Sequence, residues 1–372
     1  RVELLVSDEG SATAFDGLAQ ERCEIGLASV SQSDASASGQ LKRAAQSVVL
    51  EENVIGLDGI AIIAHWSNPV VAVSMRQLRD ILTGRITDWS QLGRARSGRI
   101  TLHIRDQQSG TLTQVELHTG MVETGERLTN ASTRYADSEE LSLAVSDDPD
   151  GLGFVSRAFI GTAHTIGIRP EDDSEIVLPK KVNISAEDYP LTRRLYFYTK
   201  PKPSGLTHDF VEYVLADAGQ RIVERFFVSL MIGVDPDSAC GTRCNEQYRS
   251  LTSAAQKLTL TFRFKPASAE LDSRAERDLR RLREFLARPN GRESPNRLIL
   301  VGFTDNLGTH AKNLELAEAR ASTIRARLVG GDNTLAPGAV KWLALGEEQA
   351  VASNQFEQGR SRNRRVEVWI EH

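Results

Sequence analysis

The sequence predicts an α/β domain followed by a smaller α+β domain. Its 372 residues are enough for two or three domains, and a 40% hydrophobic content excludes a disordered chain. Strand-like and helix-like segments alternate over the first 230 residues, and a polar, turn-rich stretch follows at 235–253. The charge balance also changes: residues 251–372 hold 20 Lys and Arg against 15 Asp and Glu, whereas the first 250 residues are acidic. These three observations predict two different modules joined by a linker.

The first module has the alternation of an α/β fold. The helix predicted at Met75–Leu82 stops at Gly84, and one or two helices are expected in 208–227. Short apolar or aromatic runs predict strands at Glu3–Val6, Gly59–Ala64, Ile100–Ile104 and Leu195–Thr199.

The second module is predicted to have the order β-α-β-α-β-β, with helices packed on one sheet. The helices expected at 272–288 and 311–329 each carry one apolar stripe. The strands expected around them are Leu258–Phe264, Arg297–Phe303, Val340–Ala344 and Arg365–Ile370.

Composition excludes several classes of function. Neither module is basic enough to predict nucleic-acid binding, and no apolar run is long enough for a transmembrane helix. The histidines and cysteines lack metal-ligand spacing, so we expect no metal and no cofactor. Cys240 and Cys244 form a C-x3-C pair that fits either a small disulfide of an oxidising compartment or two free thiols. Because the sequence starts at Arg1 and not at Met, any signal peptide or lipid anchor would lie outside the given sequence.

Two turns in the first module have the composition of an oxyanion site. One is Gly10–Thr13, and the other runs from Arg105 through Ser109 and Gly110 to Thr111. Backbone N–H groups at a helix start, hydroxyls and a guanidinium together bind anions, and glycine lets the backbone approach closely. Each turn alone also fits ordinary helix capping.

Residues 1–234 resemble the periplasmic phosphate-binding proteins of phosphate ABC transporters (PstS-like). The most specific segment is the run 77–89, QLRDILTGRITDW, and R-x3-S-G-T at 105–111 matches the family's anion loop. The resemblance implies two α/β lobes that close over the ligand, about 1–64 plus 190–234 and 66–188. The ligand contacts that it implies are Thr13, Ala14, Ser29, Asp58, Arg105, Ser109, Gly110 and Thr111.

Asp58 is the discriminating residue of this implied site. A carboxylate facing an anion is unfavourable unless the ligand carries a proton that it can donate. Phosphate carries such a proton near neutral pH and sulfate does not, so Asp58 predicts a preference for phosphate. The alternative is that Asp58 only caps the turn beside the strand.

Residues 256–372 resemble the OmpA-like peptidoglycan-binding domain. The motifs are GFTDNLG at 302–308, NLELAEARA at 313–321 and GRSRNRRVE at 359–367. The resemblance implies that Asp305 holds the ammonium of diaminopimelate in the stem peptide and that Arg320 grips its carboxylate. Asn313 lies two helical turns before Arg320 and is a further donor. The alternative is a structural Asp305–Arg320 ion pair.

Together the two resemblances imply a non-enzymatic protein of the periplasm, associated with the cell wall or anchored to the outer membrane. We expect the domains to span 1–234 and 256–372, with a linker at 235–255. The expected partners are phosphate or a similar oxyanion, peptidoglycan, and an ABC transporter or another envelope protein. The alternative is a structural envelope protein whose first module binds no phosphate. An enzyme is disfavoured, because no His or Cys beside Ser109 could activate it.

Overall fold

A computed structural model of the chain divides it into two compact units, each described by itself below. Unit 1 consists of Arg1–Asp172 and Leu191–Ser229, and unit 2 of Asp173–Pro190 and Leu230–His372. The structure describes residues 4–7, 10–39, 41–107, 109–235, 244–287, 297–329 and 337–371.

Unit 1 is built on a mixed sheet with the strand order β1-β8-β2-β6-β4-β5, and β7 pairs with both β2 and β3. The strands are β1 (Gly26–Ala28), β2 (Glu51–Ala64), β3 (Ala72–Ser74), β4 (Thr101–Arg105), β5 (Ser132–Tyr135), β6 (Gly151–Ser156), β7 (His164–Arg169) and β8 (Thr192–Thr199).

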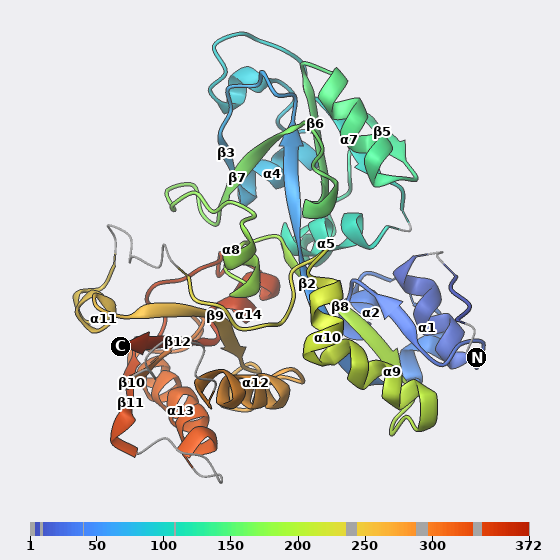
Figure 1. Cartoon of the computed structure of the whole chain (residues 1–372). Helices are drawn as coiled ribbons and strands as arrows, with labels where there is room; N and C mark the ends of the chain where they lie inside the picture. Colours follow the sequence, from blue (N-terminus) through green and yellow to red (C-terminus); the bar gives the residue numbers. More distant parts are fainter. Residues whose placement is uncertain are drawn as a thin grey trace. The chain divides into compact units, whose positions relative to one another are not determined.

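The long strand β2 joins the two halves of this sheet (Figure 1). Its first part, Glu51–Gly59, pairs antiparallel with β8, and its second part, Ile60–Ala64, pairs antiparallel with β6. The change of partner falls between Gly59 and Ile60. The buried apolar residues at 60–64 explain why this part of β2 lies in the core, because both of its faces are covered.

Helices border both halves of the sheet in unit 1. Helix α4 (Met75–Leu82) begins where the sequence predicts, because Ser74 and Gln77 form a reciprocal capping box. The others are α1 (Ser11–Ala19), α2 (Gln32–Ala37), α3 (Arg43–Ser47), α5 (Gly110–His118), α6 (Met121–Thr124), α7 (Ser138–Asp147), α9 (Gly205–Leu215) and α10 (Asp217–Val223).

Unit 2 contains a four-stranded sheet of order β11-β10-β12-β9, in which β10 and β11 are parallel and the other pairs antiparallel. The strands and main helices confirm the predicted order. They are β9 (Gln256–Arg263), α12 (Ala275–Ala287), β10 (Arg297–Gly302), α13 (His310–Val329), β11 (Val340–Ala344) and β12 (Arg365–Glu371).

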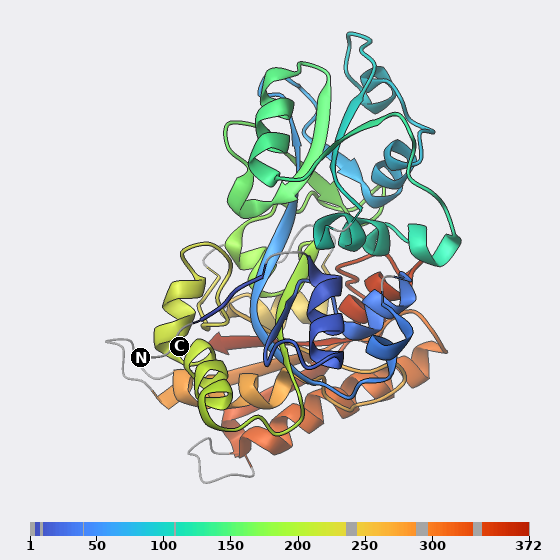
Figure 2. The same cartoon turned by 90° about the vertical axis from the view of Figure 1, so that its right-hand side faces the viewer.

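Alternation along β10 divides the core of unit 2 between the two faces of the sheet. Leu298 and Leu300 face α12 and α13, which run along one side of the sheet (Figure 2). Ile299 and Val301 face the other side, where Tyr248 of helix α11 (Glu246–Thr252) packs between Phe303 and Trp369.

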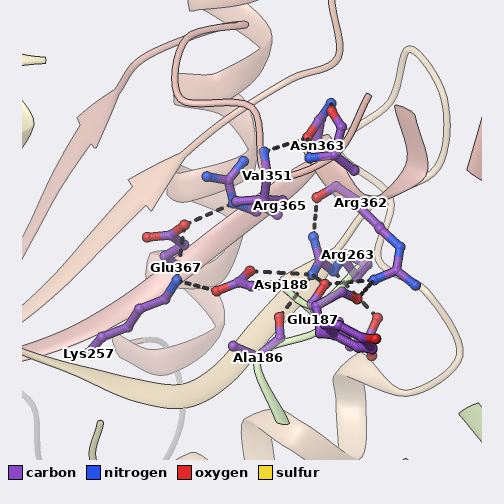
Figure 3. A network of polar contacts seen from close by, with 12 residues as sticks. Ala186, Glu187, Asp188, Lys257, Arg263, Val351, Arg362, Asn363, Arg365 and Glu367 are labelled. Carbon is purple, nitrogen blue, oxygen red and sulfur yellow. Dashed lines mark hydrogen bonds and ion pairs between the residues drawn. The ribbon is translucent and has the colours of Figure 1, made fainter. Parts of the chain in front are cut away.

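Residues 173–190 form an excursion from unit 1 that packs into unit 2. This segment contains helix α8 (Lys181–Ser185), which lies against β9 (Figure 1). Its backbone is held by two arginines (Figure 3). Arg263 donates to the carbonyls of Ala186 at 2.9 Å and Glu187 at 3.0 Å. Arg362 donates to the carbonyls of Glu187 at 3.0 Å and Tyr189 at 2.6 Å. Hydrogen bonds from arginine side chains to backbone carbonyls therefore attach the 173–190 segment to the rest of unit 2.

Buried ion pairs fasten the same segment. Lys257 contacts the carboxylates of Asp188 at 2.7 Å and Glu367 at 3.2 Å, and Arg274 contacts Glu187 at 2.9 Å (Figure 3 shows the Lys257 contacts). Burial alone would lower the pKa of the Lys257 ammonium, but Asp188 and Glu367 raise it above its usual value. The 173–190 segment and the sheet of unit 2 therefore share one buried network, in which Lys257 balances the charges of the carboxylates.

The structure departs from the sequence prediction in several places. Leu4–Val6 are exposed and form no strand, so that prediction is wrong. Helix α11 lies inside the predicted linker, and helix α14 (Glu357–Asn363) precedes β12. The excursion at 173–190 was not foreseen, since the predicted domain bounds assign it to the first module.

Two further observations concern thiols and membrane spans. Cys244 is disulfide-bonded and Cys23 is free; the predicted partner, Cys240, lies outside the described residues. In the described ranges, no helix combines the length and apolar character required to cross a bilayer.

Candidate functional site

The first candidate site lies where β2 changes partner in unit 1. Asp58 lies just before this point and is only 2% exposed. Its Oδ1 accepts a hydrogen bond from the Ser156 hydroxyl at 2.9 Å, and its Oδ2 accepts from Arg193 Nε at 3.0 Å and Nη2 at 2.8 Å. Arg193 stands directly opposite Asp58 across the β2–β8 pair. The carboxylate is thus part of a buried ion pair.

Three hydroxyl groups gather beside this ion pair, and we call Ser11, Ser29 and Thr111 the hydroxyl cluster. Ser29 donates its backbone N–H to Ser11 Oγ at 3.0 Å, and the two side-chain oxygens are 3.3 Å apart. Arg193 Nη1 donates to Thr111 Oγ1 at 2.9 Å and to Ser29 Oγ at 3.4 Å. These residues come from α1, the end of β1, the start of α5 and β8, which are distant in sequence.

Gly110 permits the close approach within this cluster. A Cβ at this position would stand 2.2 Å from Ser29 Oγ and 2.9 Å from Ser11 Oγ, well inside van der Waals contact. Any side chain at position 110 would therefore displace the hydroxyls. The sequence analysis expected this glycine to let the backbone approach a ligand, whereas in the structure it makes room for two serine hydroxyls.

Other residues predicted for this site lie at its margin or outside it. Ser109 caps α5 by accepting the N–H of Thr111 at 3.2 Å, and Thr13 in the first turn of α1 donates to the Gly10 carbonyl at 2.8 Å. Ala14, in the same turn, lies against Gly26. The guanidinium of Arg105 donates instead to the carbonyls of Tyr135 and Ala136 and to Ser138 Oγ, at 3.3, 2.6 and 2.5 Å.

The sequence analysis missed Arg193 and Ser11. The signal for Arg193 was its place beside the aromatic run 195–199, because a charged residue that enters a buried strand normally requires a partner. That signal identifies no partner by itself, because the partner depends on the register between β2 and β8. Ser11 belonged to a turn that the analysis had identified, but the implied contacts named only its neighbours.

The second candidate site lies in unit 2, after the end of β10. Asp305 is 7% exposed; its Oδ2 contacts Arg364 Nη1 at 2.9 Å, and its Oδ1 accepts from the N–H of Leu307 at 3.3 Å. Arg364 also contacts Glu357 at 2.6 Å. Asp305 is therefore ion-paired with Arg364 and not with Arg320, which contradicts the structural alternative considered for the sequence.

Arg320 has no exposed surface. Its guanidinium donates to three backbone carbonyls, those of Phe303, Ser268 and Lys265, at 2.9, 3.0 and 3.3 Å. Burial, together with the nearby Arg364, outweighs Asp305 and lowers the pKa of Arg320 to about 10. In this structure Arg320 holds the 265–268 turn against the end of β10.

Asn313, the third predicted residue, is buried in the first turns of α13. Its Oδ1 lies near Gly308, whose φ of 107° requires glycine. Burial would raise the pKa of the Glu347 carboxyl, but hydrogen bonds, including one from the Asn313 side chain, lower it. Asp305, Arg320 and Asn313 thus all lie near the turns that follow β10.

The partner switch along a long β2 strand, with an arginine-lined hydroxyl cluster at the switch, defines unit 1 as a two-part α/β binding fold. Comparison with known proteins identifies both modules. Residues 1–218 match the PBP superfamily domain and residues 263–364 match the OmpA family. The chain therefore belongs to the PBP superfamily, with a PstS-like first domain and an OmpA-family second domain.

Individual relatives agree with this division. The first domain is similar to the phosphate-binding protein PstS of Bacillus subtilis, with 23% identity over 59% of this chain and 68% of that protein. It is also similar to a putative phosphate ABC transporter substrate-binding protein of Clostridium perfringens, solved with bound phosphate, at 25% identity and a TM-score of 0.50, covering 59% of this chain and 85% of that one. The second domain is 35% identical to a peptidoglycan-associated lipoprotein of Pseudomonas putida, over 36% of this chain and 78% of that protein.

Proposed function

We propose that this chain is a peptidoglycan-tethered solute-binding protein of the periplasm. Its first domain binds phosphate or a related oxyanion, and its second binds diaminopimelate-containing peptidoglycan. The observation that carries the first half is the hydroxyl cluster beside Gly110 and Arg193, because hydroxyl and guanidinium groups gathered at one point are the donors that a small oxyanion requires. The names of the PstS relatives support the same ligand class.

In this proposal Arg193 supplies the guanidinium that the sequence analysis assigned to Arg105. Arg105 is committed to the end of β5, whereas Arg193 Nη1 points to Thr111 and Ser29. The ligand would take hydrogen bonds from the hydroxyl cluster and from Arg193, and Asp58 would orient that arginine.

The proposal for the second domain rests on Asp305, Asn313 and Arg320. Asp305 would hold the ammonium of diaminopimelate, and Asn313 would donate a further hydrogen bond. Arg320 can grip the carboxylate only after the 265–268 turn releases its guanidinium. The relatives named as peptidoglycan-associated lipoproteins support this assignment. A cell-wall location follows, with an ABC transporter or another envelope protein as the expected recipient of the ligand.

Calorimetric titration of the ligand-stripped chain with phosphate tests the first half. We expect saturable binding to one site, and we expect Gly110→Ala to weaken it about 10- to 100-fold, because the new methyl group would displace Ser29 and Ser11. Gly338→Ala is the matched control, since a Cβ there meets nothing within 4 Å. No heat with phosphate would favour the alternative of a structural envelope protein.

A further inference from the structure

The charge of Asp58 is already compensated within the protein. Arg193 donates twice to Oδ2 and Ser156 donates once to Oδ1, with all three distances at or below 3.0 Å. Both members of the ion pair are buried, at 2% exposure for Asp58 and 9% for Arg193. In the low dielectric of such a site, the guanidinium removes most of the repulsion that the carboxylate would exert on an anion.

The same guanidinium also faces the hydroxyl cluster. Its Nη1 reaches Thr111 and Ser29, so Arg193 stands between the carboxylate and the donors that would hold the ligand. A bare carboxylate at this point would accept only a ligand that brings a proton. A carboxylate that is ion-paired with arginine does not require a protonated ligand, because the guanidinium attracts an unprotonated oxyanion.

We infer that Arg193 is a specificity-determining residue that makes the first domain a general tetrahedral-oxyanion site, which accepts sulfate as well as phosphate. The inference rests on the proposed function and reverses the preference that Asp58 alone predicts. The ligand class is a small, doubly charged oxyanion, whether or not it carries a proton.

Titration of the full chain at about pH 8 with phosphate and, separately, with sulfate tests this inference. We expect the two dissociation constants of the unmodified protein to lie within about tenfold, since a compensated site gains little from the ligand's proton. In Arg193→Gln the uncompensated charge of the buried Asp58 carboxylate should weaken sulfate binding at least about 100-fold more than phosphate binding. The double variant Asp58→Asn/Arg193→Gln should restore the near-equal ratio, because neither charge remains.

Controls separate specificity from folding. Arg194→Gln, one residue further along β8 and therefore on the opposite face, should leave the ratio unchanged. Thermal unfolding verifies that each variant is folded. If Arg193→Gln does not fold, the double variant replaces it, because it buries neither charge. A near-equal ratio of the sulfate and phosphate dissociation constants in both the double variant and the unmodified chain then supports the inference. Phosphate binding with sulfate more than about 100-fold weaker in the unmodified chain would overturn the inference but leave the proposed function standing. Failure of both anions to bind would overturn the proposed function itself.

Discussion

Lys257→Met is expected to destabilise unit 2 by about 3–5 kcal/mol, the usual result of removing one partner from a buried ion pair. The substitution keeps the length of the side chain but leaves the carboxylates of Asp188 and Glu367 without their shared cation. Because Asp188 belongs to the 173–190 segment, the attachment of this segment should weaken as well. Urea unfolding followed by tryptophan fluorescence measures the effect, since Trp369 lies in this core.

The acid dependence of unfolding gives a second readout of the same network. Burial would raise the pKa of the Glu367 carboxyl, but Lys257 and Arg365 outweigh it and hold the pKa at about 2. A lowered folded-state pKa stabilises the fold above the unfolded value of about 4.3, and this contribution is lost as the pH falls toward 2. In Lys257→Met the loss should begin at higher pH. The exposed Lys341→Met on β11 is the control, and an equal effect of both variants would contradict the network's role.

Asp305→Asn is expected to reduce binding to isolated peptidoglycan sacculi by about 100-fold. The substitution keeps the shape of the side chain but removes the negative charge proposed to hold the diaminopimelate ammonium. Co-sedimentation with sacculi at increasing protein concentration measures the change. Phosphate binding by the first domain should stay the same in this variant.

Glu357→Gln is the matched control for Asp305. Glu357 is the second carboxylate on Arg364, at 2.6 Å, but it lies on α14 and has no proposed ligand role. If Asp305 acted only by fixing Arg364, the two variants would weaken sacculus binding alike. That outcome would argue against a direct contact between Asp305 and the stem peptide.

The parts of the fold that sequence reasoning predicted are those with local signals. The apolar stripes of α12 and α13 and the strand-like runs of β10 and β12 predicted the main elements of unit 2 in their order. The attachment of residues 173–190 was not predictable in this way. Its partners Lys257, Arg263 and Arg362 lie more than 60 residues away, and no periodicity connects them to the segment.

In the candidate sites as well, local motifs identified residues but could not identify contacts between distant segments. The motifs named Gly110, Thr111 and Ser29, and the fold brings these three residues together. They could not show that Asp58 faces Arg193, because that contact depends on the register of two strands 135 residues apart. Nor could they show that Arg320 is covered by the 265–268 turn, since side-chain burial depends on how the loop returns to the sheet.

Retention of phosphate on sedimented sacculi tests the central claim most directly, because it requires both domains to work in one chain. Radiolabelled phosphate would be equilibrated with the full chain and sacculi, and the label in the pellet measured against the protein in the pellet. The account predicts about one phosphate per sedimented chain, and a reduced ratio in Gly110→Ala without loss of protein from the pellet. Protein that sediments without label, or label that stays with protein in the supernatant, would contradict a wall-tethered oxyanion receptor.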